Sequence, residues 1–329
     1  MDRYNVSFYV KYMKKTIFRG LIYLGILCGS IQSPNQALIP SKFIPSKTIL
    51  AATAALAGAA YCYHSYTTHT IPKLLPENPF IKHIIFDLDG VLLDTNISQT
   101  LYSLGIINLF GYLVTKGHFP SKTDLFGALR PIPAINTSFS EHEGKPMPPI
   151  LVDWQKGTQT HEQLLTSCNQ YFQAQYQAGT LSKYETDIFM KLSKLMFDCS
   201  EYIASKCAIQ SSLDLLAPLA EYAHKHNIQL YILSNWDAQS LDLAQQKFPE
   251  LFKYFPQDHI VISGKVGLLK PDPALFSYIL DTHDINPDEC LFIDDEHINI
   301  TQAQALKIHT IHCTAQAHKN LLNRILAEL

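Results

Sequence analysis

The stretch that decides the fold is IIFDLDGVLLD, residues 84–94, in which an apolar run ends in two acids separated by one leucine. Asp87 and Asp89 follow the run directly, so a hydrophobic strand is predicted to deliver two carboxylates to one place. Carboxylates this close repel each other, and burying them is costly unless something positive lies beside them. The rest of the chain therefore has to supply a positive charge.

Composition narrows the classes of function. The chain has 329 residues, 47% of them hydrophobic, which allows two domains or one domain with an insertion. Its net charge of −3 argues against a nucleic-acid binder that works through a basic surface. The seven cysteines are scattered without a C-x-x-C pair, and the fourteen histidines lack H-E-x-x-H spacing. Neither a disulfide framework nor a zinc site is predicted.

From residue 80 onward, short apolar runs alternate with helical periodicity, which is typical of an α/β domain with a parallel sheet. The predicted strands are 81–87, 228–235, 259–263, 290–295 and 307–313. Predicted helices include 211–226 and 273–283, the second with Asp272 as its N-cap. The predicted core is a Rossmann-like, doubly wound parallel sheet formed by residues 80–95 and 211–329.

Residues 96–210 interrupt this alternation and are predicted to form an inserted α-helical cap domain. Apolar residues recur at helical spacing near its start, at Leu101, Leu104, Ile107 and Phe110. Ser182, with Glu185 three residues later, predicts a capping box where a further helix begins. A proline-rich stretch, 131–149, is predicted to be a long loop within the insertion.

The first 79 residues differ from the rest and are predicted to be a targeting or tethering region with a linker. Basic residues between 11 and 19 precede an apolar run at 21–31, which is a signal-peptide pattern. A second apolar run, 49–63, is marginal for a membrane span, and a docked amphipathic helix is equally open. Export or membrane association is predicted, with signal cleavage, a membrane anchor and a cytoplasmic location left as alternatives.

Chemically useful side chains end the predicted strands. They are Asp87 and Asp89 after the first, Ser234 and Asn235 after the second, Lys270 in the loop after the third, and Asp294 and Asp295 after the fourth. Ligands of a parallel sheet bind beyond the carboxyl ends of its strands, so these groups are expected to converge. Up to four carboxylates require a hard cation, and oxygen ligands suit Mg²⁺. A phosphoryl group would then meet the ammonium of Lys270 and the hydroxyl of Ser234.

Four motifs in this order resemble those of the haloacid dehalogenase (HAD) superfamily, subclass I, in which a helical cap follows the first motif. They are DLDGVLLD, LSN, KPDP, and the acidic pair followed by Asn299 and Ala303. The resemblance spans residues 81 to about 325, and the segment DWQKGTQTHEQLL, 153–165, is similar to the W-x-x-G stretch of that subclass. Lys307 stands where the family usually has a glycine.

The resemblance implies roles for the acids. Asp87 is the expected nucleophile, which would form an aspartyl-phosphate. Asp89 is the expected general acid and, later, general base. The expected Mg²⁺ ligands are Asp87, Asp294 and the backbone carbonyl of Asp89. Asp295 is expected to orient Lys270 or a metal-bound water.

The resemblance also implies roles for the remaining motif residues. Ser234 and Lys270 are expected to bind the phosphoryl oxygens and stabilise their charge. Asn235 is expected to help bind phosphate through its backbone N–H or its side chain. Asn299 and Ala303 are expected to be packing and turn residues.

The predicted function is Mg²⁺-dependent hydrolysis of a phosphomonoester, with a small phosphorylated metabolite as the substrate. The alternatives are a sugar phosphomutase, a 2-haloacid dehalogenase of the same superfamily, and a catalytically quiet, membrane-tethered binding protein. Asp89 favours a phosphatase over a dehalogenase, because a halide leaves without a proton and the family's dehalogenases lack an acid at this position. No nucleic-acid partner is predicted, and the oligomeric state is left open.

Overall fold

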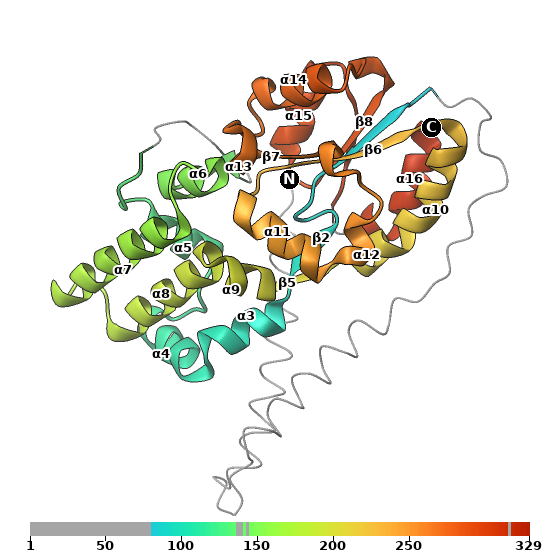
Figure 1. Ribbon diagram of the computed structural model, residues 1–329. Coiled ribbons are helices and arrows are strands. Elements are labelled where there is room, and N and C mark those ends of the chain that lie inside the picture. Colours follow the sequence, from blue (N-terminus) through green and yellow to red (C-terminus); the bar gives the residue numbers. More distant parts are fainter. Residues whose placement is uncertain (1–79, 136–140, 143–144, 315–316) are drawn as a thin grey trace, which may run out of the picture. The chain divides into compact units, whose positions relative to one another are not determined.

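The computed structural model describes residues 80–135, 141–142, 145–314 and 317–329 (Figure 1). All of these residues belong to one compact unit. The targeting or tethering region predicted for residues 1–79 lies outside the described residues.

Five parallel strands form the main sheet, in the order β7-β6-β1-β8-β9. They are β1 (His83–Phe86), β6 (Gln229–Ser234), β7 (Ile260–Ile262), β8 (Cys290–Asp294) and β9 (His309–His312). Each predicted strand is therefore present. The first strand lies in the middle, and the chain adds β6 and β7 on one side and β8 and β9 on the other. This is the doubly wound parallel sheet that the sequence predicts.

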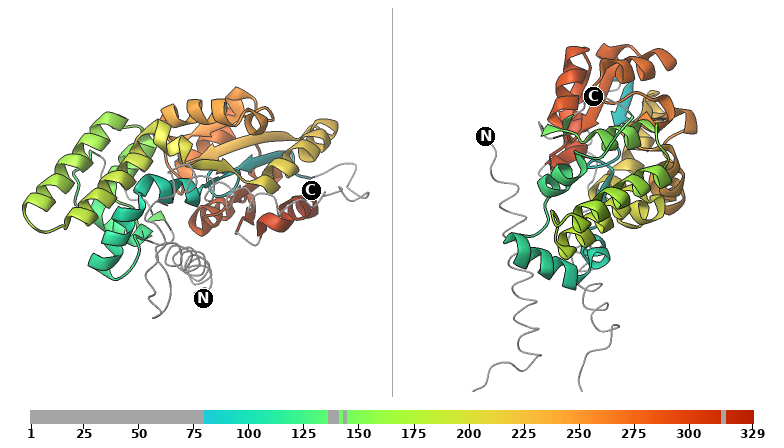
Figure 2. Two further views of the ribbon diagram at one scale, coloured as in Figure 1. Left: turned by 90° about the horizontal axis from the view of Figure 1, so that it is seen from below. Right: turned by 90° about the vertical axis from the view of Figure 1, so that its left-hand side faces the viewer.

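Helices cover both faces of this sheet (Figure 2). Ile84 and Phe86 pack in one apolar cluster with α10 (Gln210–His226) and α16 (Leu321–Glu328). Ile85 packs in a second cluster with α14 (Pro273–Thr282) and α15 (His297–Ala305). Successive side chains of a strand point to opposite faces, so a strand that is apolar at every position buries both. Shorter helices complete this core: α11 (Ala238–Lys247), α12 (Pro249–Phe252) and α13 (Ser263–Val266).

A group of helices, called the cap from here on, is inserted between two short strands that pair antiparallel, β2 (Leu93–Thr95) and β5 (Lys206–Ala208). The cap helices are α3 (Ile97–Leu104), α4 (Ile106–Lys116), α5 (Lys122–Leu129), α6 (Pro149–Lys156), α7 (His161–Gln177), α8 (Lys183–Phe197) and α9 (Cys199–Ala204). Most of their buried apolar residues form a cluster of their own, whereas Ile203 of α9 packs in the core cluster. The predicted proline-rich loop contains a small antiparallel pair, β3 (Glu141–His142) with β4 (Lys145–Pro146).

The cap contacts the core through the W-x-x-G stretch. The Ser263 hydroxyl donates to the backbone carbonyl of Gln155 at 2.6 Å. Gly157 ends α6 with φ 65°, and a Cβ on it would lie 2.9 Å from the carbonyl oxygen of Gly264. A side chain there would be strained and would also push α6 away from α13, which explains the glycine.

Several local predictions can be compared with the structure. Ser182 and Glu185 form the predicted capping box, and Asp272 caps α14 by accepting from the Ala274 N–H. The apolar residues at the start of the cap do not share one face of a single helix, because α3 ends at Leu104 and α4 starts at Ile106 in a new direction. Leu104 is buried, whereas Ile107 and Phe110 are 74% and 60% exposed.

Lys307 directly follows the last turn of α15 and has φ 64°. This is the left-handed region that favours glycine. The glycine that the family usually carries here therefore has a conformational reason, and this chain places a lysine in the same backbone conformation.

Among the described residues, no single helix has both the length and the apolar character needed to cross a membrane. Helices α3 and α4 meet that test only as a pair, which is bent by 82°.

Candidate active site

The loop after β1 carries the first two acids and the glycine of the opening motif. Asp87 is buried, and its Oδ1 accepts the N–H of Leu88 at 2.7 Å. Gly90 has φ 79°, and a Cβ on it would lie 2.3 Å from Oδ2 of Asp295. The loop therefore requires glycine both for its conformation and for the close approach of the Asp295 carboxylate.

Lys270 is the positive charge that the opening motif requires. Its side chain is 1% exposed, and Nζ lies 2.9 Å from Oδ1 of Asp87 and 2.7 Å from Oδ2 of Asp294. The third N–H of the ammonium donates to the carbonyl of Leu233 at 2.9 Å. Because all three donors are used, the ammonium is fixed between the two carboxylates.

The end of β6 supplies Ser234 and Asn235. Ser234 is buried, and its hydroxyl hydrogen-bonds the Asp87 carboxylate. Asn235 Nδ2 donates to the carbonyl of Lys270, and the Lys270 N–H donates to Asn235 Oδ1, both at 2.8 Å. The Asn235 side chain therefore holds the loop that carries Lys270. A phosphate contact was predicted for either the backbone N–H or the side chain of Asn235. Because the side chain is used here, the contact through the backbone N–H is the one that stays a prediction.

The end of β8 supplies the second pair of acids. Asp294 is fully buried, and its Oδ1 accepts the Glu296 N–H at 2.7 Å. Nδ2 of Asn299 lies 3.1 Å from both oxygens of Asp294. Asn299 was expected to be a packing or turn residue. It is indeed buried in α15, and its amide has the further role of orienting the Asp294 carboxylate.

Asp295 has fewer partners than its neighbour. Among the described residues, its carboxylate takes part in no hydrogen bond or ion pair. All three donors of Lys270 point elsewhere, so the predicted orienting contact of Asp295 on Lys270 is absent. The alternative prediction, contact with a metal-bound water, stays a prediction.

The acids carry more negative charge than Lys270 compensates. The pKa of Asp87 is raised to about 7, because burial and the charge of Asp294 outweigh the lowering effects of Lys270 and Ser234. Burial, with the charges of Asp87 and Asp294, raises the pKa of Asp295 to about 9. Burial alone would lower the pKa of Lys270, but the two carboxylates that contact it raise it. The site therefore favours an additional cation.

The donor atoms fit a hard divalent cation. One carboxylate oxygen each from Asp87, Asp294 and Asp295 lies within 4.8 Å of the other two. An all-oxygen set of this kind suits Mg²⁺, which binds few carboxylates and keeps several waters. A cation bound here would give the Asp295 carboxylate a partner and would lower the raised pKa of Asp87.

Asp89 lies apart from this cluster, in contact with a residue that sequence reasoning missed. Its side chain is 44% exposed, and both oxygens accept from Lys206 Nζ, at 2.7 and 2.6 Å. Lys206 is buried, lies on β5 and contacts the ring of Tyr202. Asp89 and Lys206 are 117 residues apart, and the antiparallel pairing of β5 with β2 that brings them together has no signature in the sequence.

A family model described as haloacid dehalogenase-like hydrolase matches residues 81–306. Bifunctional epoxide hydrolase 2 of Rattus norvegicus is 30% identical over 118 residues, which make up 35% of this chain and 21% of that protein. The Mus musculus protein of the same name is 34% identical over 94 residues, which are 27% of this chain and 17% of that protein. This chain thus spans about a fifth of the length of these relatives.

A solved structure of similar fold is an alanine variant of a HAD family enzyme from Bacteroides thetaiotaomicron, in complex with magnesium and inorganic phosphate. It is 19% identical, and the alignment covers 70% of this chain and 93% of that chain, with a TM-score of 0.43. The matched family model covers more than half of this chain and includes all of the acids, Ser234 and Lys270. The chain therefore belongs to the haloacid dehalogenase-like hydrolase family.

Proposed function

We propose that this hydrolase cleaves phosphomonoesters, depends on Mg²⁺ and forms an aspartyl-phosphate. The observation that carries the proposal is the pair Asp87 and Asp89: one carboxylate is buried against Lys270, and the other is half-exposed two residues away. A phosphate ester expels an alkoxide, which needs a proton, whereas a halide needs none. The second acid is thus useful to a phosphatase and has no task in dehalogenation.

In the proposed first step, an oxygen of Asp87 attacks phosphorus, and the bond between phosphorus and the ester oxygen breaks. Asp89 gives its proton to the leaving oxygen. In the second step Asp89 takes a proton from water, which attacks the aspartyl-phosphate and releases inorganic phosphate. Ser234 and Lys270 lie beside Asp87 and would stabilise the charge on the transferring group.

Mg²⁺ would be held by Asp87, Asp294 and the backbone carbonyl of Asp89, and it would neutralise charge on the phosphoryl group. Asn299 would fix the Asp294 carboxylate through the two contacts described above. Asp295 would face the waters that the ion keeps.

The ion pair between Asp89 and Lys206 also bears on this chemistry. Both oxygens of Asp89 accept from Lys206 Nζ, at 2.7 and 2.6 Å, so neither oxygen faces a leaving group while this pair is formed. Asp89 therefore has to leave Lys206 before the first step. Lys206 is buried, whereas the Asp89 side chain is 44% exposed, so rotation of the Asp89 side chain would separate the pair.

The proposed function is tested with the purified protein on p-nitrophenyl phosphate, a panel of sugar phosphates and nucleotides, and 2-chloropropionate, each with and without Mg²⁺. Release of phosphate that requires Mg²⁺ is the expected result. Dechlorination of 2-chloropropionate without turnover of any phosphate ester would overturn the proposal. Intramolecular phosphate transfer without hydrolysis would favour the mutase alternative.

Mg²⁺ should stabilise the fold, and more so at higher pH. The pKa values of Asp87 and Asp295 are raised on folding, so in the metal-free protein the cost of ionising them grows as the pH rises from about 4 to about 9. The Tm in EDTA should therefore fall over this range, and Mg²⁺ should restore it. At a hundredfold excess over its Kd, Mg²⁺ should add about 2.7 kcal/mol.

The measurement is a thermal-shift titration at several pH values, with Ca²⁺ as the comparison ion. Asp295→Asn is the informative variant. It removes one carboxyl group with a raised pKa, so the Tm in EDTA should depend less on pH. A Tm that does not respond to millimolar Mg²⁺ at any pH would remove the metal site.

Replacing Asn299 with alanine should weaken Mg²⁺ binding without abolishing catalysis. The amide contacts both oxygens of Asp294 at 3.1 Å, and loss of a group that orients a metal ligand typically costs about 10- to 100-fold in metal affinity. The Mg²⁺ concentration for half-maximal activity should rise by that factor, with kcat retained at saturating Mg²⁺. Gln304→Ala, an exposed position on the same helix, is the matched control. An unchanged Mg²⁺ dependence would contradict the assignment.

A further inference from the structure

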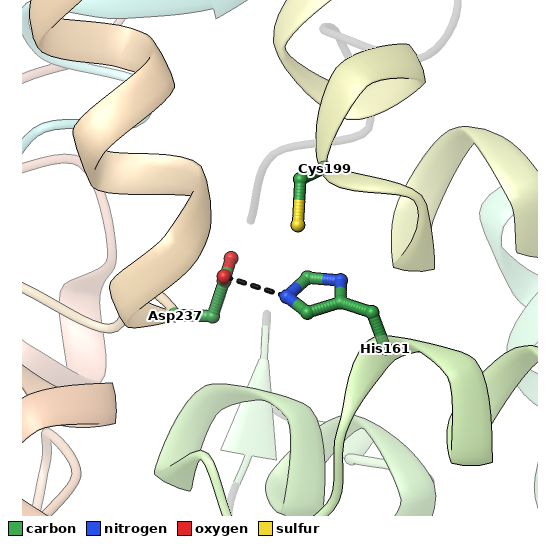
Figure 3. A group of neighbouring side chains, drawn as sticks. All are labelled: His161, Cys199 and Asp237. Carbon is green, nitrogen blue, oxygen red and sulfur yellow. Dashed lines mark hydrogen bonds and ion pairs between the residues drawn. The ribbon is translucent and has the colours of Figure 1, made fainter.

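A second cluster of metal-binding side chains lies outside the proposed phosphatase chemistry (Figure 3). His161 is the first residue of α7, Cys199 is the first residue of α9, and Asp237 is the N-cap of α11. One ligand atom of each residue lies within 4.8 Å of the other two. Two of these residues come from the cap and one from the core.

The ring of His161 is oriented as metal-binding histidines usually are. Nδ1 lies 2.5 Å from the backbone carbonyl of Phe197, and Nε2 lies 2.8 Å from Oδ1 of Asp237. A carbonyl and a carboxylate oxygen can only accept, so in the metal-free protein Nδ1 donates to Phe197 and Nε2 donates to Asp237. A metal ion would take the place of the Nε2 proton. A backbone carbonyl that holds one ring nitrogen fixes the tautomer that leaves the other nitrogen for a metal.

Asp237 has an oxygen without a partner. The residue is 3% exposed, and its Oδ1 accepts from the Ser240 N–H as well as facing His161. Oδ2 is buried and has no hydrogen-bond partner among the described residues. A buried carboxylate oxygen left unpaired is costly, so a cation at this point would stabilise it.

Cys199 completes a set of one nitrogen, one sulfur and one oxygen. Its sulfur points toward the space between the His161 ring and the Asp237 carboxylate (Figure 3). A neutral imidazole, a thiolate and a carboxylate together carry two negative charges. A divalent ion would make the site neutral, which suits its partly buried position.

A cavity of about 380 Å³ gives an ion a path to this cluster. His161 and Cys199 line it, together with the acids Glu162 and Asp198, and none of its lining residues is a lysine or an arginine. The mouth of the site therefore attracts cations, and a water in the cavity can serve as a further ligand.

We propose that His161, Cys199 and Asp237 bind a divalent transition-metal ion such as Zn²⁺, and that this ion links the cap to the core. The mixed set of nitrogen, sulfur and oxygen suits Zn²⁺ and excludes Mg²⁺, which requires oxygen ligands. In a tetrahedral zinc site such ligand atoms lie about 3.3–3.6 Å apart. Side-chain rotations that move the ligand atoms by about 1 Å would complete the site. On binding, the ion replaces the thiol proton of Cys199 and any proton on Nε2 of His161.

The test is a titration of the metal-free, full-length protein with Co²⁺ in an excess of Mg²⁺, which keeps the carboxylate site filled. One equivalent of Co²⁺ should produce the intense near-ultraviolet absorption of a thiolate bound to cobalt, and Zn²⁺ should abolish it by displacement. Cys199→Ser should remove the absorption. His161→Gln should weaken Co²⁺ binding by at least the roughly 10- to 100-fold that follows loss of a group that only orients a ligand.

Cys207→Ser is the matched control, since it removes another half-buried thiol and should leave the titration unchanged. Circular dichroism of each variant establishes that it is folded. The proposal is overturned if the wild type shows no thiolate–cobalt absorption, or if the absorption survives Cys199→Ser. Neither outcome depends on phosphatase activity.

Discussion

Asp87→Asn should abolish turnover of phosphate esters, because the amide cannot attack phosphorus or carry the phosphoryl group. Removal of the nucleophile in an enzyme with covalent catalysis costs on the order of 10⁶-fold in kcat. The substitution is nearly isosteric, and it also removes one buried negative charge beside Asp294 and Asp295. The fold should therefore persist, and the Tm of the metal-free variant should not fall below that of the wild type.

The measurement is phosphate release under single-turnover and multiple-turnover conditions, with Tm recorded in parallel. Asp94→Asn is the matched control, because it is the same substitution at an exposed acid in the same stretch. Wild-type turnover by Asp87→Asn would refute the role of Asp87 as nucleophile. If both variants lose activity together, the loss comes from local structure rather than from chemistry.

Asp89→Asn should reduce kcat by about 10²- to 10⁴-fold, which is the usual contribution that proton transfer by a positioned side chain makes to the rate. The effect should depend on the leaving group. p-Nitrophenolate leaves without help, so p-nitrophenyl phosphate should partly rescue the first step of Asp89→Asn. No such rescue is expected for Asp87→Asn, which lacks the nucleophile whatever the leaving group.

Asparagine is the right replacement at position 89, because its amide oxygen can still accept from Lys206, which is buried and paired at 2.6 Å. Asp89→Ala would leave that ammonium without its carboxylate and should also lower Tm. An equal loss of kcat by Asp89→Asn on alkyl and p-nitrophenyl esters would show that Asp89 does not supply the proton.

Much of the site could be predicted from the sequence, because each motif residue lies at the end of an apolar run. The place of such residues can be predicted without knowing which distant parts of the chain are in contact. Once a strand belongs to a parallel sheet, its carboxyl end lies at the ligand-binding edge. Asp87, Ser234 and Asp294 were placed in this way, and the structure brings all three to Lys270 or to one another. The uses of Asn235 and Asn299 were not predictable, since an amide can satisfy either the backbone or a neighbouring carboxylate.

The sequence by itself determined the alternation of apolar strands and helices, the position of the helical insertion and the acids that surround Lys270. These follow from local periodicity and from the cost of burying charge, which act over a few residues. Only the tertiary structure decided the contacts between the cap and the core. Lys206 meets Asp89 across 117 residues, and His161 meets Asp237 across 76. Such pairs depend on how two separately packed apolar clusters are joined, and no spacing along the chain encodes that geometry.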